Sequence, residues 1–273
     1  TGPVLAVGEP MRDGQAGAEL QPPAGDGLPG NLPDLPLALV WQVGSCGADI
    51  EQFQQPRGVA LNPHSGYAYI ADAGNRRVIL RDLGDGSLVD YLESDLFEEP
   101  FDLDVDLLGN VFVLDALSQT IYRLEDPAGT PVALPSGTAF YRPRGLGMDL
   151  NGNFYVADTG GARVVKLTGT NGAVEFQEGG ADSLLGQGQP VDVLLLPTGA
   201  FFAVTAQDGT LWRLDTGESW LAAAPASTID GPHLAGLTTS AFFLSDPERR
   251  LITYFNGAGQ PLVQRRSELF AKP

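Results

Sequence analysis

Residues 154–167 read FYVADTGGARVVKL, and this stretch is the third of three near-copies in the chain. The earlier copies are YIADAGNRRVILR at 69–81 and FVLDALSQTIYRL at 112–124. Each copy has a short apolar segment that ends in aspartate, then a loop and a second apolar segment, which is typical of two paired β-strands. The copies recur every 43 positions, measured at the aspartates Asp72, Asp115 and Asp158. A fixed period of this length indicates a repeat architecture.

Each repeat unit opens with a proline and holds more than two strands. Successive prolines lie 44, 43, 47 and 42 residues apart: Pro56, Pro100, Pro143, Pro190 and Pro232. First strands are predicted at 57–61, 101–105, 144–148, 191–195 and 233–237. Second strands are predicted at 67–72, 111–115, 153–158, 200–205 and 241–246, and third strands at 76–82, 120–126, 162–168, 210–215 and 251–256. A weaker fourth strand is predicted at 87–92, 173–178 and 260–265. Four short strands per unit predict an all-β fold, a β-propeller of four-stranded blades.

Two units resemble the NHL repeat: F..PRGVALN...GYAYIADAGNRRV at 53–78 and FYRPRGLGMDLNGNFYVADTGGARV at 140–164. Weaker matches lie at 97–121, 187–211 and 229–252. This resemblance implies a six-bladed ring, although only five units are clear. We therefore expect the N-terminal strand LALVWQV at 37–43 to close the ring as the outer strand of the last blade. A five-bladed ring, or a chain that stops before its last blade, are the alternatives.

The chain is expected to divide into two parts. Residues 1–36 are rich in proline and glycine without a sustained period, which predicts an extended arm or linker. Residues 37–273 form the NHL-like propeller. An arm of this kind and a chain that begins with Thr1 favour an exported protein, periplasmic, on the cell surface or anchored as a lipoprotein. A cytoplasmic location is not excluded, because Cys46 is the single cysteine and a disulfide within the chain is impossible.

The net charge of −18, from 34 acidic and 16 basic residues, argues against nucleic-acid binding. No apolar run approaches the roughly 18–20 residues needed to span a bilayer, so no direct membrane span is expected, although the arm could act as a tether.

The aspartates that recur at the end of the second strands are expected to be structural: Asp72, Asp115, Asp158 and Asp246. A carboxylate there can accept hydrogen bonds from loop amides and from a nearby arginine. Arg77 and Arg163 are the expected partners of Asp72 and Asp158. The turn DLNGN at 149–153 resembles part of a calcium loop, but it lacks the distant bidentate glutamate of such loops, which favours a tight β-turn.

The candidate binding site lies at the residues that follow each opening proline, because the resemblance places these at one mouth of the propeller channel. Phe101 and Val191 also directly follow an opening proline. The side chains proposed to contact a ligand are Arg57, Asp102, Arg144, Asp192 and His233. Loops and channel mouths on a rigid scaffold commonly carry function. The competing interpretation is that these arginines and aspartates only neutralise one another around a solvated pore.

The expected function is that of a non-enzymatic binding or scaffold module, which presents a face or its channel mouth to a protein or glycan partner. No catalytic residue, metal ligand or cofactor is assigned. The alternative is a metal-dependent hydrolase or lyase of the six-bladed superfamily that includes gluconolactonase-like and strictosidine-synthase-like proteins. Asp102 and Asp192 could serve as metal ligands there. A zinc site with three histidines, as in related lyases, is excluded because the chain has only His64 and His233.

Overall fold

The computed structural model describes residues 40–62, 64–106, 108–124, 130–149, 151–180, 183, 185, 188–195, 201–205, 210–214, 220–225, 233–238, 241–246, 251–256 and 261–266. The chain divides into two units, Thr1–Pro36 and Leu37–Pro273. The predicted arm at 1–36 lies outside the described residues and stays a prediction.

The described part of the second unit contains five antiparallel sheets, each made of four strands that are consecutive in the chain. The first sheet has β1 (Pro56–Asn62), β2 (Tyr67–Asp72), β3 (Arg77–Asp82) and β4 (Leu88–Glu93), with a short 3₁₀ helix η1 (Ala73–Asn75) after β2. The second has β5 (Pro100–Val105), β6 (Val111–Asp115), β7 (Thr120–Leu124) and β8 (Val132–Ala133). The third has β9 (Gly145–Met148), β10 (Phe154–Asp158), β11 (Arg163–Leu167) and β12 (Val174–Gly179).

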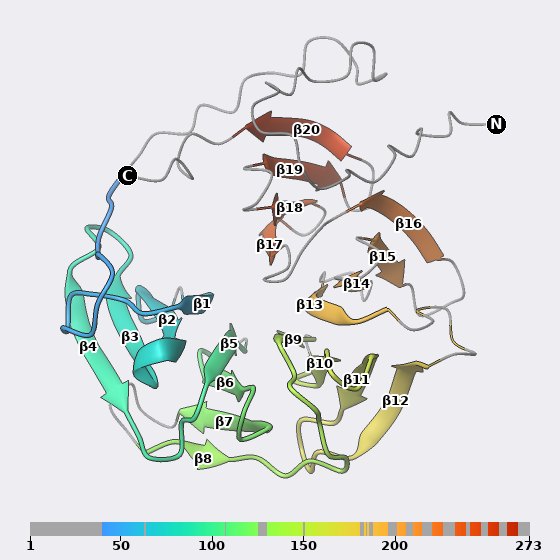
Figure 1. Cartoon of the computed structure of the whole chain (residues 1–273), viewed down its shortest axis with the longest axis horizontal. Helices are drawn as coiled ribbons and strands as arrows, with labels where there is room; N and C mark the ends of the chain where they lie inside the picture. The colour runs from blue at the N-terminus through green and yellow to red at the C-terminus, as the bar shows by residue number, and fades with distance from the viewer. Residues whose placement is uncertain are drawn as a thin grey trace, which may run out of the picture. The chain divides into compact units, whose positions relative to one another are not determined.

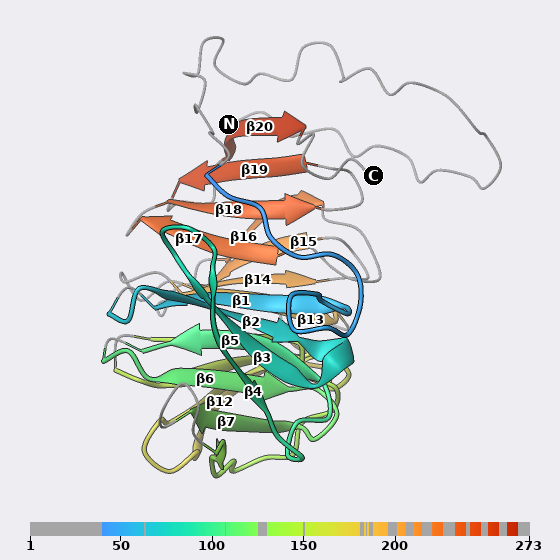
Figure 2. The ribbon, with the colours of Figure 1, turned by 90° about the vertical axis from the view of Figure 1, so that its left-hand side faces the viewer.

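The two remaining sheets repeat this order. The fourth has β13 (Pro190–Leu195), β14 (Phe201–Thr205), β15 (Thr210–Leu214) and β16 (Trp220–Pro225). The fifth has β17 (His233–Thr238), β18 (Ala241–Asp246), β19 (Leu251–Asn256) and β20 (Pro261–Arg266). Its alternating strand directions are visible in Figure 2. The first, second and third strands predicted from the sequence are all confirmed to within two residues, whereas β8 and β16 were not named in advance.

The sheets are joined through their first strands. Contacts link β1 to β5, β5 to β9, β9 to β13 and β13 to β17, and Figure 1 shows these strands innermost in their sheets. Each first strand is the edge strand of its sheet, so its outer row of backbone groups has no β-strand partner within that sheet. This arrangement brings residues that are about one repeat apart in the chain next to one another.

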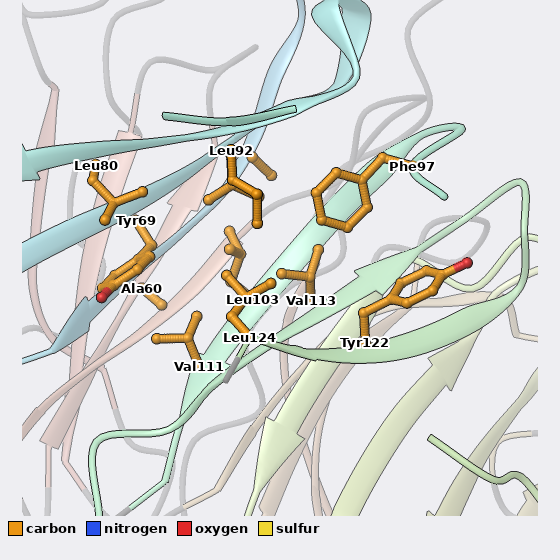
Figure 3. Packing of buried hydrophobic residues seen from close by; sticks show 12 residues of the cluster. Ala60, Tyr69, Leu80, Leu92, Phe97, Leu103, Val111, Val113, Tyr122 and Leu124 are labelled. Carbon is orange, nitrogen blue, oxygen red and sulfur yellow. The ribbon is translucent and has the colours of Figure 1, made fainter. Parts of the chain in front are cut away.

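The hydrophobic core consists of layers between neighbouring sheets. Between the first and second sheets, Tyr69 and Leu80 pack with Leu103 and Val113 (Figure 3). A second layer contains Phe112 and other residues of the second sheet and Phe154, Val156 and Leu167 of the third. The strands β6 and β10 are buried along their whole length because each has a neighbouring sheet on both faces. That explains why VFVLD and FYVAD read as continuous apolar runs.

The predicted N-terminal strand at 37–43 is wrong for residues 40–43, which form no strand, and residues 37–39 lie outside the described part. The Trp41 indole Nε1 instead donates a hydrogen bond to the Leu83 carbonyl at 3.1 Å. The indole ring lies against Gly86, where a Cβ atom would come within 2.8 Å of it. This segment therefore packs on the turn between β3 and β4. In the described residues no N-terminal strand closes a sheet, and the number of blades stays a prediction.

Candidate functional site

The predicted site residues lie at the starts of consecutive first strands. Arg57 lies on β1, Asp102 on β5 and Asp192 on β13, while Arg144 directly precedes β9. The structure brings these four residues together, as described below. His233 begins β17, and its side chain lies outside the described atoms.

Phe101 is the centre of a cation–π arrangement that links three sheets. The guanidinium carbon of Arg57 lies 5.1 Å from the centroid of the Phe101 ring, and that of Arg144 lies 5.5 Å from the same centroid. Both distances are within the range of about 6 Å for cation–π attraction. The ring is buried, whereas both arginines are partly exposed. Two cationic groups thus contact one ring, whose repeat position was noted in the sequence but not assigned to the site.

Asp102 connects the second sheet to the third. Its Oδ2 accepts a hydrogen bond from the Leu146 amide at 2.8 Å, and its Oδ1 accepts one from the Leu103 amide at 2.9 Å. On the other side lies Gly58, where a Cβ atom would approach the Asp102 Cα to 2.7 Å. Asp102 therefore provides a hydrogen-bond acceptor for the Leu146 amide at the edge of β9, which has no β-strand partner. Its position depends on Gly58, because a larger residue there would collide with Asp102.

Asp192 lies close enough to Asp102 for their charges to interact. Burial raises the pKa of Asp102 well above its usual range, and the charge of Asp192 raises it further, while the two amide hydrogen bonds lower it. Asp192 is itself buried and accepts a hydrogen bond from the Val193 amide at 2.8 Å. Two neighbouring carboxyl groups disfavour double ionisation, so the charge of Asp192 adds to the effect of burial on the pKa of Asp102.

Asp104 repeats the role of Asp102 two residues further along β5. Its Oδ2 accepts a hydrogen bond from the Met148 amide at 2.7 Å, and its Oδ1 accepts one from the Val105 amide at 2.7 Å. Burial raises the pKa of Asp104 to about 6, although these two bonds oppose the rise. Asp104 is not among the site residues predicted from the sequence. The signal for it is the strand FDLDV, in which aspartate alternates with apolar residues.

Three of the four recurring aspartates, Asp72, Asp115 and Asp158, have the structural role predicted for them. The Arg77 Nε lies 2.8 Å from the Asp72 Oδ2, and the Arg163 Nε lies 2.8 Å from the Asp158 Oδ2. Asp115 has no arginine at the matching position and accepts hydrogen bonds from four amides instead: Glu98, Glu99, Leu117 and Ser118. The side chain of Asp246 lies outside the described atoms.

The DLNGN segment is a turn closed by its own aspartate. The Asp149 Oδ1 accepts hydrogen bonds from the amides of Asn151 and Asn153, each at 2.9 Å. The equivalent Asp106 bonds the amides of Leu108 and Asn110 in the same way. These two turns form walls of a groove of about 360 Å³ at the far end of β5 and β9 from the mouth. None of the predicted site residues lines it.

The enzyme alternative needs a metal ion, and the fit of these residues to one is poor. Both oxygens of Asp102 accept hydrogen bonds from amides, and among the described residues no group of three or more His, Cys, Asp or Glu side chains could hold a metal ion.

The thiol of Cys46 is exposed. In the described part of the chain, no helix has the length and apolar character to cross a membrane.

Comparison with known proteins identifies the fold. No protein-family model matches the chain, and no curated protein matches its sequence. A solved streptogramin B lyase is 16% identical with a TM-score of 0.62, over 78% of this chain and 69% of that protein. A chain of a nidogen/laminin complex is 16% identical with a TM-score of 0.64, over 79% and 81%. The β-propeller domain of Cps50 (Swd1) from Myceliophteria thermophila is 11% identical with a TM-score of 0.56, over 78% and 74%. Likeness at this identity concerns the fold alone, and it agrees with the four-stranded sheets described above: the chain is a β-propeller protein.

Proposed function

We propose that this propeller is a binding module whose channel mouth takes a carboxylate of a protein partner. The observation that carries the proposal is the pair of guanidinium groups, Arg57 and Arg144, held on the Phe101 ring. A guanidinium group presents a planar fork of donors that matches a carboxylate. Because the ring already orders both arginines, less side-chain entropy is lost when a ligand binds.

The electrostatics of the mouth support the same ligand. The raised pKa of Asp102 reduces the negative charge beside the arginines. The net charge of −18 over the whole chain nevertheless favours a partner with a positive net charge. We therefore expect a partner surface that is basic overall and places one acidic side chain at the mouth. Among the neighbours in fold, the nidogen/laminin structure is that of a protein complex, which is compatible with this role.

The test uses a short lysine- and glycine-rich peptide with one central glutamate, and the same peptide with glutamine. Calorimetric titration is expected to show about tenfold weaker binding of the glutamine peptide, or about 1.4 kcal/mol. The double variant Arg57→Lys/Arg144→Lys should lose most of the preference for glutamate, since lysine keeps the charge but not the fork. The matched control is Arg76→Lys/Arg142→Lys, which makes the same change at two exposed arginines that do not contact the Phe101 ring.

Three outcomes would count against this proposal. Equal binding of the glutamate and glutamine peptides would show that the protein does not recognise the carboxylate. Preferential binding of a short glucuronate oligosaccharide over the glutamate peptide would make the partner a glycan. Turnover of lactones or esters that is lost in Asp102→Asn would favour the enzyme alternative, for which the raised pKa of Asp102 is the supporting observation.

A further inference from the structure

At its far end from the mouth, the interface between the first and second sheets is closed. Asn62, the last residue of β1, is 3% exposed, and its Nδ2 donates a hydrogen bond to the Gly109 carbonyl of the second sheet at 2.8 Å. On the same face, Tyr69 pairs with Leu80 across β2 and β3, and both side chains are buried in the core layer (Figure 3). An amide donor and apolar side chains thus fill this end of the interface.

The interface between the second and third sheets has charged residues at two of these positions. Asp106, which directly follows β5, takes the place of Asn62 in the register of the strands. Arg123 pairs with Phe112 and takes the place of Leu80. An ionised carboxylate only accepts hydrogen bonds, so Asp106 cannot make the bond by which Asn62 closes the first interface. Both charged side chains are partly exposed, and the groove of about 360 Å³ lies at this place.

The groove combines an apolar lining with charges of both signs. Phe112 and Phe154 meet edge to face, with their ring centroids 5.0 Å apart. Asp106 and Asp149 each contribute a carboxylate, one from the second sheet and one from the third, and Arg123 contributes a guanidinium group. The apolar side chains that line the groove come from both sheets: Leu108, Phe112, Leu134, Met148 and Phe154. A ligand that fits this lining has an apolar body, a cationic group and an anionic group.

We propose that this groove binds an apolar dipeptide that is free at both ends. Its ammonium group contacts the carboxylates of Asp106 and Asp149, its carboxylate contacts the guanidinium group of Arg123, and its side chains pack on the apolar lining. Asp106 follows β5 and Arg123 lies on β7, so their backbones are two strand spacings, or about 10 Å, apart. An extended dipeptide spans about 7 Å, so side chains that reach inward from both strands meet its two ends. The proposal is independent of the one for the mouth, because the two sites share no residue.

The test measures the binding of leucyl-phenylalanine to the protein by calorimetric titration. The free dipeptide is expected to bind about tenfold more tightly than its N-acetylated form, which lacks the ammonium group. It is also expected to bind about tenfold more tightly than its C-terminal amide, which lacks the carboxylate. Seryl-serine keeps both charges but has no apolar side chain, so it should bind more weakly than leucyl-phenylalanine.

Two variants copy the residues of the first sheet into the groove. Asp106→Asn should reduce the preference for the free amino group, and Arg123→Leu should remove most of the preference for the free carboxylate. Asparagine and leucine occupy these register positions in the first sheet, so both variants are expected to fold, which their melting temperatures check. The matched control is Asp82→Asn, because the Asp82 Oδ1 accepts a hydrogen bond from the Gly84 amide at 2.8 Å in another turn. It should change neither preference.

Three outcomes would overturn the proposal. The first is equal affinity of the free and blocked dipeptides for the wild type, a comparison that needs no variant. The second is unchanged binding in both Asp106→Asn and Arg123→Leu, which would mean that the dipeptide binds elsewhere. The third is weaker binding in Arg57→Lys/Arg144→Lys, which would assign the dipeptide to the mouth. This double variant is expected to bind the dipeptide as the wild type does, so the failure of one proposal is distinguishable from the failure of the other.

Discussion

Aspartate side chains act in two different environments in this propeller. Those at the ends of the second strands accept hydrogen bonds from amides of their own repeat unit, and Asp72 and Asp158 also form an ion pair with an arginine. Asp102 and Asp104 on β5 accept hydrogen bonds from backbone amides of β9, across the interface between two sheets. Among the described residues, neither aspartate forms a salt bridge. A buried carboxylate without a cation is stabilised only by hydrogen bonds, so desolvation dominates and its pKa rises.

Asp104 on β5 and Asp149 in the turn after β9 are expected to have opposite effects on the dependence of stability on pH. The pKa of Asp104 in the folded chain is about 6, above its ordinary value of 3.8. Its contribution to the free energy of unfolding is therefore complete below about pH 4 and is lost as the pH rises through 6. Over that range the wild type should lose on the order of 1–3 kcal/mol more than Asp104→Asn does, as measured by urea unfolding at several pH values.

Asp149 is the control for this prediction. Hydrogen bonds from Asn153 and Asn151 outweigh desolvation and lower its pKa. Its contribution is therefore present above the unfolded pKa and is lost as the pH falls. Asp149→Asn should leave the slope between pH 5 and 7 unchanged and reduce the loss of stability below about pH 4. Identical pH profiles for the wild type and Asp104→Asn would contradict the environment assigned to Asp104.

At the scale of the strands, glycines decide how closely the first strands approach one another. A Cβ atom at Gly145 would lie 2.6 Å from the Cα atom of Asp192 on β13. The clash involves backbone, which cannot rotate away as a side chain can. The close approach of β9 and β13 therefore depends on this residue, and so does the proximity of Asp192 to Asp102.

Gly145→Ala should consequently destabilise the protein through the interface between the third and fourth sheets. The expected loss is about 1–3 kcal/mol, the usual cost of an overpacked interior position, measured by denaturant unfolding. Gly84→Ala in the turn between β3 and β4 is the matched control, because the nearest atom to its added Cβ would be a carboxylate oxygen at 3.1 Å. An equal loss in both variants would show a general effect of replacing glycine rather than one of strand approach.

At the scale of the whole molecule, stability arises from layers between neighbouring sheets, because each of the first three sheets contacts the next through one core cluster. The net charge of −18 acts against this packing, since like charges on a folded chain repel one another.

Salt should therefore stabilise the protein. Raising sodium chloride from 10 mM to 500 mM shortens the Debye length from about 30 Å to about 4 Å, which screens the repulsion. The melting temperature is expected to rise by several degrees, as followed by circular dichroism. Calcium chloride at equal ionic strength should give a similar rise. A much larger rise with calcium would indicate a specific cation site and would favour the metal-dependent alternative.

Local pattern accounts for how well the strands were predicted. The alternation of apolar residues and the turn signals between them depend on neighbours in the chain, so the limits of β2, β6 and β10 follow directly from the repeat. The pairing of Arg77 with Asp72 follows as well, because the two residues face each other across one hairpin. Residues 40–43 are the exception. Their apolar pattern is typical of a strand, but Trp41 packs instead on the turn between β3 and β4.

The sequence by itself determined the all-β class, the four-stranded repeat and the scaffold role of its recurring aspartates, because each of these rests on interactions within one unit. Only the tertiary structure placed Arg57 and Arg144 on one phenylalanine ring, brought Asp192 within electrostatic reach of Asp102, and left Val59 exposed where its counterparts are buried. These contacts join residues one or more repeats apart. Their distances depend on how closely whole sheets pack, and a repeat period carries no information about that spacing.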